Sequence, residues 1–285
     1  MLALIRFNIA LFSRTLGTEI SEIVAGGLTD LGFSCRIQMF TFEPACMNIV
    51  MPAVLFPMSE IDRIPRTTMF YNTEDLEHQP EEKQRVVIEL ARRGFPVWDY
   101  ARKNLAWFAA QGFPDRVRHV PLGYAKAIDR VRRRPWEERD IDVLFYGKLS
   151  QRRVDVVAAL MQTNLTVGVF SHAYGDLRDD LVSRSKLVLN IPAKASFVAE
   201  CPRSTFLAAN QRLCIAERPS YPLQPGWSDA IHYVAYSELI ATCQALASNR
   251  DAVLALETKA YAAMRALPIS TGLAEALAAV TPRAV

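Results

Sequence analysis

The sequence predicts an α/β protein made of two Rossmann-like domains that face a central cleft. Short apolar runs alternate along the chain with amphipathic stretches, which is the pattern of strands and crossover helices in a parallel sheet. The alternation occurs twice, and 285 residues suffice for two compact domains of about 130 residues each. We place the boundary after Arg134, which gives expected domains at residues 1–134 and 135–285. Whether the last helix packs back on the first domain is left open.

In the first domain, the segment at residues 17–31 has apolar side chains three and four positions apart, which predicts an amphipathic helix. The segments at residues 81–94 and 101–112 are expected to be helices that end at glycines. Apolar and β-branched runs predict the strands between them. These expected strands are residues 2–12, 34–40, 47–55, 67–72, 95–100 and 116–124.

The second domain repeats this alternation after a basic segment. Its strands are expected at residues 142–148, 165–170, 186–192 and 212–217. Its helices are expected at residues 153–161, 175–185, 204–210, 236–248 and 251–266.

Composition limits the class of protein. With 51% hydrophobic and 22% charged residues the chain is typical of a globular protein, and a net charge of +3 is too small to indicate a nucleic-acid partner. Four arginines crowd into residues 130–134, but Pro135 and acidic residues follow at once, which favours a solvated linker over a phosphate or membrane-surface patch. Five cysteines without a CxxC motif suggest neither a metal site nor a disulfide framework. We expect a cytoplasmic protein, with peripheral contact at the inner membrane face left open.

One strand end carries a concentration of positive charge. The apolar run at residues 141–146 stops at Gly147, and Lys148, Arg152 and Arg153 follow within six residues. Ligands of open parallel sheets bind beyond the carboxyl ends of strands, where a glycine permits close approach and a helix N-terminus attracts anions. Arginine can grip phosphate oxygens with two hydrogen bonds. These residues therefore predict a diphosphate site. The alternative is a glycine turn with surface cations. The sequence contains neither a P-loop nor a GxGxxG motif.

A second strand end in this domain repeats the arrangement. Arg203, Ser204 and Thr205 stand at the start of the helix expected at residues 204–210, with Ser204 as its N-cap. Together with the N–H groups of Ser204 and Thr205, Arg203 would form a second anion cradle. Glu200 could bind ribose or sugar hydroxyls, or form a salt bridge to Arg203.

At this point the sequence resembles a known family. The segments "DVLFYGKLSQRR", "SHAYGDLRDDLVSRSKLVLNI" and "ECPRSTFLAANQRLCIAE" are similar to the nucleotide-binding half of GT-B glycosyltransferases, in the bacterial CgeB-like branch of the group 1 enzymes. In the first half, "YNTEDL", "VWDYARKN" and "VPLGY" resemble the same branch. The resemblance covers most of the chain and depends on the order and spacing of short motifs.

The resemblance implies a nucleotide-sugar donor, held mainly by the second half, and a hydroxyl acceptor, held mainly by the first. It places Gly147, Lys148, Arg152 and Arg153 at the diphosphate. It places residues 172–174, with His172 and Tyr174, at the nucleotide base. Arg203, Ser204 and Thr205 would complete the phosphate site. It implies no metal and no cofactor beyond the donor, which is a co-substrate, and a role in polysaccharide biosynthesis. One departure is that no second glutamate of an E-x7-E spacing follows Glu200.

Carboxylates at strand ends of the first domain are the candidates for a catalytic base. Removal of a proton from an acceptor hydroxyl requires such a group near the cleft. Glu74 is the first candidate and Asp99 the second, with a helix cap or a turn salt bridge as the alternative role of each. Three further residues at strand ends could bind an acceptor: Ser13, Thr15 and Asn72.

The leading functional expectation is a metal-independent glycosyltransferase that moves a sugar from a nucleoside diphosphate to a hydroxyl acceptor, such as a glycan, a lipid-linked compound or a small molecule. Three alternatives remain open: an inactive protein that binds a nucleotide sugar or a glycan, a nucleotide-sugar epimerase, and a protein that binds nucleic acid or a membrane surface through residues 130–134.

Overall fold

A computed structural model describes residues 6–13, 18–195, 202–221 and 223–279, and these form two compact units. Unit 1 comprises the described residues up to Ala127 and from Pro268 onward, and unit 2 runs from Ile128 to Leu267. The division therefore lies before Ile128 and not after Arg134. Within the described residues no helix is both long enough and apolar enough to cross a lipid bilayer.

The division lies before the basic segment because that segment is bound to unit 2. Asn210 is fully buried, and its Nδ2 donates to the Ile128 carbonyl at 2.8 Å. Its Oδ1 accepts from the backbone N–H groups of Arg130 and Val131 at 2.8 and 2.7 Å. Residues 128–131 are thus part of the unit 2 fold and not a linker.

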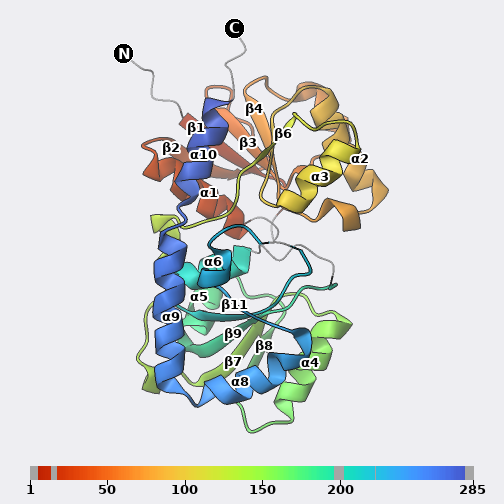
Figure 1. Ribbon diagram of the computed structural model, residues 1–285. Helices are drawn as coiled ribbons and strands as arrows, with labels where there is room; N and C mark the ends of the chain where they lie inside the picture. Colours follow the sequence, from red (N-terminus) through yellow and green to blue (C-terminus); the bar gives the residue numbers. More distant parts are fainter. Residues whose placement is uncertain (1–5, 14–17, 196–201, 222, 280–285) are drawn as a thin grey trace. The chain divides into compact units, whose positions relative to one another are not determined.

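Unit 1 contains a parallel six-stranded sheet of order β2-β1-β3-β4-β5-β6, covered by helices on both faces (Figure 1). The strands are β1 (Arg6–Leu11), β2 (Ser34–Met39), β3 (Met47–Met51), β4 (Thr68–Asn72), β5 (Val97–Asp99) and β6 (Val117–His119). The helices are α1 (Thr18–Asp30), α2 (Glu81–Arg92), α3 (Arg102–Ala110) and α10 (Ile269–Ala278), with short 3-10 turns at Ala53–Leu55, Met58–Arg63 and Leu76–His78.

Helix α10 belongs to unit 1 because it packs against α1 (Figure 1). A Cβ atom at Gly27 of α1 would lie 2.4 Å from Ile269 and 2.7 Å from Leu273, so only glycine allows this close approach. The helix predicted at residues 251–266 corresponds instead to α9 of unit 2, and α10 follows it.

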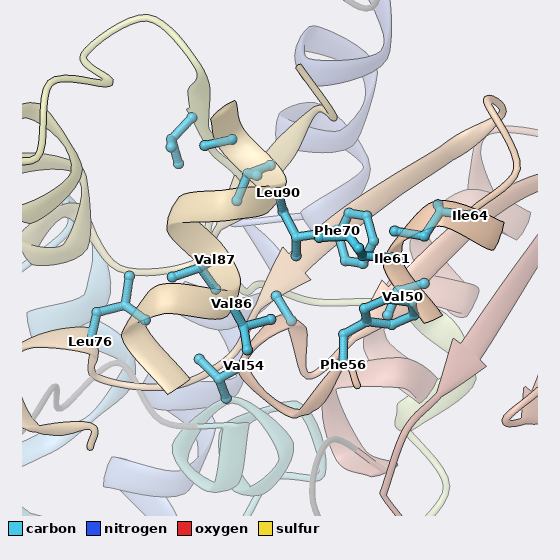
Figure 2. Packing of buried hydrophobic residues seen from close by; sticks show 14 of the residues in the cluster. Val50, Val54, Phe56, Ile61, Ile64, Phe70, Leu76, Val86, Val87 and Leu90 are labelled. Atoms are coloured by element: carbon cyan, nitrogen blue, oxygen red, sulfur yellow. The ribbon is translucent and has the colours of Figure 1, made fainter. Parts of the chain in front are cut away.

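A hydrophobic core cluster of unit 1 lies between the sheet and α2. Figure 2 shows Leu90 of α2 beside the strand residue Phe70, and Val86 of α2 beside Val54. Leu90 and Phe70 are fully buried, and each such side chain contributes about 1.5–3 kcal/mol on burial. The spacing of Val86, Val87 and Leu90 gives α2 one apolar face, which is why this segment forms a helix on the sheet.

Unit 2 contains a parallel five-stranded sheet of order β11-β10-β9-β7-β8. Its strands are β7 (Ile141–Tyr146), β8 (Val167–Phe170), β9 (Ser185–Asn190), β10 (Leu213–Glu217) and β11 (His232–Val234). Its helices are α4 (Gln151–Met161), α5 (Gly175–Arg184), α6 (Pro202–Ala209), α7 (Trp227–Ala230), α8 (Leu239–Ala247) and α9 (Arg250–Arg265), with 3-10 turns at Trp136–Glu138 and Tyr236–Glu238. A further 3-10 turn, Lys126–Ile128, spans the division.

Helices cover both faces of the unit 2 sheet. Helices α4 and α8 bury Val157, Leu160 and Cys243 against the strands on one face. Helices α5, α6 and α9 contact the strands as well, and α9 lies beside α6 (Figure 1). Two parallel sheets, each covered by crossover helices, confirm the predicted α/β class.

Candidate functional site

The strand order of unit 2 identifies the crevice in which a ligand would bind. From β7 the chain passes to β8 on one side, and it then crosses to β9 on the other side. Open parallel sheets bind ligands at such a reversal, beyond the carboxyl ends of the strands. Here β7 and β9 end at Tyr146 and Asn190, so the candidate site of unit 2 lies at these two residues.

Gly147 and Arg203 meet at this point. Gly147 follows β7 with a φ of +126°, a backbone conformation that glycine adopts without strain. A Cβ atom at Gly147 would lie 2.7 Å from Nη2 of Arg203, so the guanidinium fits here because Gly147 has no side chain. The Cζ of Arg203 lies 4.5 Å from the centre of the Tyr146 ring, and Nη1 donates to Oδ1 of Asn190 at 3.2 Å. Two residues predicted from separate segments are thus brought together over the strand ends.

The start of α6 differs from the prediction. The helix begins at Pro202, so Ser204 lies in its first turn and is not its N-cap. Ser204 and Thr205 are fully buried, and Oγ of Ser204 accepts from Nδ2 of Asn190 at 2.7 Å. The Ser204 side chain therefore holds a neighbouring residue; that backbone N–H groups of Ser204 and Thr205 bind phosphate stays a prediction. Glu200 lies outside the described residues.

The two arginines of α4 are bound to protein groups. Nη2 of Arg152 lies 2.6 Å from both carboxylate oxygens of Glu217, the last residue of β10. Its Cζ also lies 4.2 Å from the centre of the Tyr236 ring. Arg153 donates from Nε to the Ile191 carbonyl at 2.7 Å and from Nη1 to the Lys148 carbonyl at 2.5 Å. Arg153 thus fixes the loop after β7, while a phosphate contact by either arginine stays a prediction.

The remaining residues of the predicted donor site are on the surface. Lys148 is exposed, and its ammonium group has no partner among the described residues. His172 is exposed, with its Nδ1 3.0 Å from Oγ of Ser171. Tyr174 precedes α5 and is 48% exposed. The side chains of His172 and Tyr174 are therefore accessible to a ligand. That they bind the nucleotide base stays a prediction.

In unit 1 the ends of β4 and β5 hold a buried polar network. Asn72 and Asp99 are adjacent in the sheet register and both fully buried, and Nδ2 of Asn72 donates to Oδ2 of Asp99 at 2.7 Å. Oδ1 of Asp99 accepts from the Ala101 N–H at 2.9 Å and from Nδ2 of Asn104 at 3.0 Å. Asp99 therefore binds the turn before α3, although the N-cap residue of this helix is Ala101. Because neither side chain reaches solvent, we do not propose Asp99 as a base or Asn72 as an acceptor ligand.

The same network fixes Glu74. The side-chain amides of Asn72 and Asn104 both donate to the Glu74 carbonyl at 2.8 Å. The Glu74 carboxylate itself is half-buried, and it makes no hydrogen bond or ion pair within the described part of the chain. Its main chain is thus held rigidly while its carboxylate remains available to a ligand.

Burial changes the acidity of Glu74. Desolvation raises the pKa of its carboxyl group from 4.5 to about 7, and Lys83 nearby opposes this shift. A general base is most effective when its pKa lies near the working pH. The pKa of Glu74 therefore suits a general base, and its role as the base stays a prediction.

A further acceptor candidate follows β1, and two carboxylates and a histidine lie close together after β4. Ser13 is half-buried two residues after β1, and Thr15 lies outside the described residues. Asp75, Glu77 and His78 each bring one ligand atom to within 4.8 Å of the others, as a metal site would require. However, Nζ of Lys103 lies 3.3 Å from Asp75 and 2.7 Å from Glu77. This ammonium group already pairs with both carboxylates, so the cluster gives no reason to propose a metal.

The basic segment at residues 130–134 is electrically balanced. Each of its four arginines pairs with a carboxylate at 2.9–3.5 Å: Arg130 with Asp179, Arg132 with Glu138, Arg133 with Asp129 and Arg134 with Asp180. This arrangement favours a solvated surface over a phosphate or nucleic-acid patch.

Comparison with solved structures identifies the fold. HepE from Anabaena, solved with UDP and glucose, has a TM-score of 0.62 at 12% identity, over 96% of this chain and 100% of HepE. The chain has the GT-B fold. TarM from S. aureus, solved with UDP and α-GlcNAc-glycerol, gives 0.61 at 10% identity over 83% of this chain and 55% of TarM. Sucrose-phosphate synthase from Thermosynechococcus elongatus has a TM-score of 0.58 at 11% identity, over 96% of this chain and 98% of the synthase. No family model matches the sequence, and no curated protein does.

The GT-B fold confirms the predicted resemblance at the level of architecture, while the CgeB-like branch stays a prediction. Sequence reasoning missed Asn190 and Glu217, which hold Arg203 and Arg152. Both are the last residues of their strands, β9 and β10. A polar residue at or near the end of a predicted buried strand was the signal that could have identified them, because such residues lie at the ligand edge of the sheet.

Proposed function

We propose that this protein is a glycosyltransferase that moves a sugar from a nucleoside-diphosphate donor to a hydroxyl acceptor. The donor would be bound by unit 2, with Arg203 over Gly147 at the reversal of strand order facing the diphosphate. This placement of a guanidinium at the carboxyl ends of β7 and β9 is the observation that carries the proposal. The UDP in the solved HepE and TarM structures makes UDP the first donor nucleotide to test.

In this proposal the charge of the leaving diphosphate is met by protein cations, chiefly Arg203 and Lys148, and by the N-terminal end of α4. Preorganised charges in a crevice stabilise a departing anion without reorganisation, which makes such interactions a major source of rate. The acceptor would be bound by unit 1, where Glu74 would accept the proton of the attacking hydroxyl. The nucleotide sugar is then a co-substrate, and we propose no additional cofactor.

Arg203→Ala is expected to weaken UDP binding by about 10- to 100-fold, because a charge-assisted hydrogen bond to phosphate is worth about 1.5–3 kcal/mol. Isothermal titration calorimetry with UDP would measure the loss. Arg132→Ala is the matched control, since the Arg132 side chain is 69% exposed and pairs only at the surface. Equal UDP affinity in wild type and Arg203→Ala would contradict the donor site.

A protein that binds a nucleotide sugar without transferring it is the second candidate. Its support is the missing second glutamate of the E-x7-E spacing and the pairing of Arg152 with Glu217. The two candidates differ in turnover: release of UDP from a UDP-sugar in the presence of an acceptor supports the transferase, and tight UDP-sugar binding with no turnover supports the binding protein.

A further inference from the structure

Two arginines at the carboxyl edge of the unit 2 sheet are held by partners of different charge. Arg152 is bound by the carboxylate of Glu217, which cancels its positive charge. Arg203 is bound by the side-chain amide of Asn190, which is neutral. The residue that closes β9 therefore holds Arg203 without adding a negative charge beside it.

Asn190 is itself oriented by the fold. It ends β9, pairs with Ala216 of β10 and is only 7% exposed. Its Nδ2 donates to Oγ of Ser204 at 2.7 Å, which turns Oδ1 toward Nη1 of Arg203. The amide orientation is thus fixed by a hydroxyl that is fully buried.

The aromatic ring of Tyr146 supports the same guanidinium. Tyr146 is 4% exposed, and its ring centre lies 4.5 Å from Cζ of Arg203. A ring face attracts a cation without neutralising its charge. Amide, ring and the open space at Gly147 each contribute to the position of the guanidinium.

We propose that Asn190 is a positioning residue that fixes Arg203 over Gly147 for an anionic ligand without adding a negative charge of its own. This inference rests on the proposed donor site, in which Arg203 is a diphosphate cation. An aspartate has nearly the same shape as asparagine and would bind a guanidinium more strongly, through a charge-assisted bond. An aspartate would also cancel the positive charge of Arg203 and repel phosphate. An asparagine at this position is therefore what an anion-binding site requires, whereas a site with only a structural role would favour the aspartate.

Asn190→Asp tests the inference with UDP as the probe. We expect UDP to bind at least about tenfold more weakly, while the melting temperature stays equal to that of wild type or rises, because the introduced carboxylate would pair with Arg203. If Asn190 had only a structural role, the substitution would instead lower the UDP affinity and the melting temperature together. We also expect Arg152→Ala to weaken UDP binding less than Arg203→Ala does. Calorimetric titration and thermal unfolding monitored by circular dichroism measure these effects.

Asn249→Asp is the matched control. Asn249 is exposed and caps α9 of the same unit, where its side chain accepts from the Ala252 N–H at 3.1 Å. Asparagine and aspartate are about equally good N-caps, so this variant adds the same charge to unit 2 without a change of fold. Its UDP affinity should equal that of wild type.

The outcomes separate this inference from the proposed function. UDP affinity lost in Arg203→Ala but retained in Asn190→Asp overturns the positioning role alone, as does an affinity loss accompanied by a lower melting temperature. A wild-type protein that binds none of UDP, ADP and GDP overturns the donor site itself and the inference with it. Should Asn190→Asp not fold, Asn190→Ala gives the decision: weaker UDP binding than wild type supports the inference, and unchanged binding overturns it.

Discussion

Glu74→Gln is expected to lower kcat/KM for sugar transfer by about 10²- to 10⁴-fold, the usual contribution of a general base. Glutamine has the same shape but cannot accept the proton of an acceptor hydroxyl. The Glu74 backbone is held by Asn72 and Asn104, whose bonds go to its carbonyl, so the substitution leaves those contacts in place. Release of UDP from a UDP-sugar with a hydroxyl acceptor is the assay.

The pH dependence of the rate identifies the group. A base must be ionised to act, so with a pKa of about 7 for Glu74 kcat/KM should rise with pH and reach a plateau above about pH 8. At pH 6 about a tenth of the carboxyl groups would be ionised, and the rate should be about a tenth of the plateau. Glu74→Gln should remove this rise from the residual activity.

The same pKa shift has a consequence for stability that requires no substrate. Between pH 4.5 and about 7 the folded protein keeps a proton on Glu74 that the unfolded chain has lost. The free energy of unfolding must therefore fall as pH rises through this window, by about 2–3 kcal/mol in total. Urea unfolding at pH 5 and pH 8 should show this fall in wild type and a smaller one in Glu74→Gln.

Glu82→Gln is the control for both measurements, because Glu82 is an exposed carboxylate in the first turn of α2, near Glu74 in the sequence. It should retain the rate, its pH profile and the pH dependence of stability. A pH profile in Glu74→Gln that still rises through pH 7 would show that another group is the base.

The catalytic candidates show where sequence reasoning reached its limit. Alternating apolar runs placed Glu74 and Asp99 correctly at the carboxyl ends of neighbouring strands. What distinguishes them includes a hydrogen bond between distant positions: Asp99 lies 27 residues after Asn72, whose Nδ2 donates to its buried carboxylate. A pattern of local periodicity contains no information on such long-range hydrogen bonds, so the sequence kept Asp99 as the second candidate although its side chain is fully buried.

The donor site shows a related limit. The sequence placed Gly147, Arg152 and Arg203 at the correct edge of the unit 2 sheet, because strand ends can be predicted from apolar runs. It could not show that a carboxylate, Glu217, holds Arg152 while a neutral amide, Asn190, holds Arg203. These pairings follow from strand order, and the position of β10 beside β9 is a property of topology and not of local pattern.

The largest stability effect is expected in unit 2, for Glu257→Gln. Glu257 of α9 is 1% exposed, and its two carboxylate oxygens accept from Nη1 and Nη2 of Arg139 at 2.8 and 3.1 Å. Arg212, also 1% exposed, has its Nη1 3.9 Å from the same carboxylate. Burial, together with Arg139, lowers the pKa of Arg212 to about 10, so the two cations depend on Glu257 for compensation.

Removing that carboxylate leaves two buried guanidinium groups without this counter-charge. The loss of one partner from a buried ion pair costs about 3–5 kcal/mol, and urea unfolding followed by circular dichroism would measure it. Asp229→Asn is the control, since it removes a surface pair of the same helix: Asp229 and Lys259 lie 3.4 Å apart, with side chains 60% and 65% exposed. Such a pair contributes only about 0–1 kcal/mol.

A third variant separates charge from shape. Replacing Arg139 and Glu257 together by methionine and leucine removes the buried ion pair as a whole, and similar replacements are often neutral or stabilising. The double variant should therefore be more stable than Glu257→Gln, although Arg212 remains buried with backbone carbonyls, such as that of Val182, as acceptors. A loss below about 1 kcal/mol in Glu257→Gln, or a double variant less stable than the single one, would show that packing and not charge compensation holds residues 128–139 on α9.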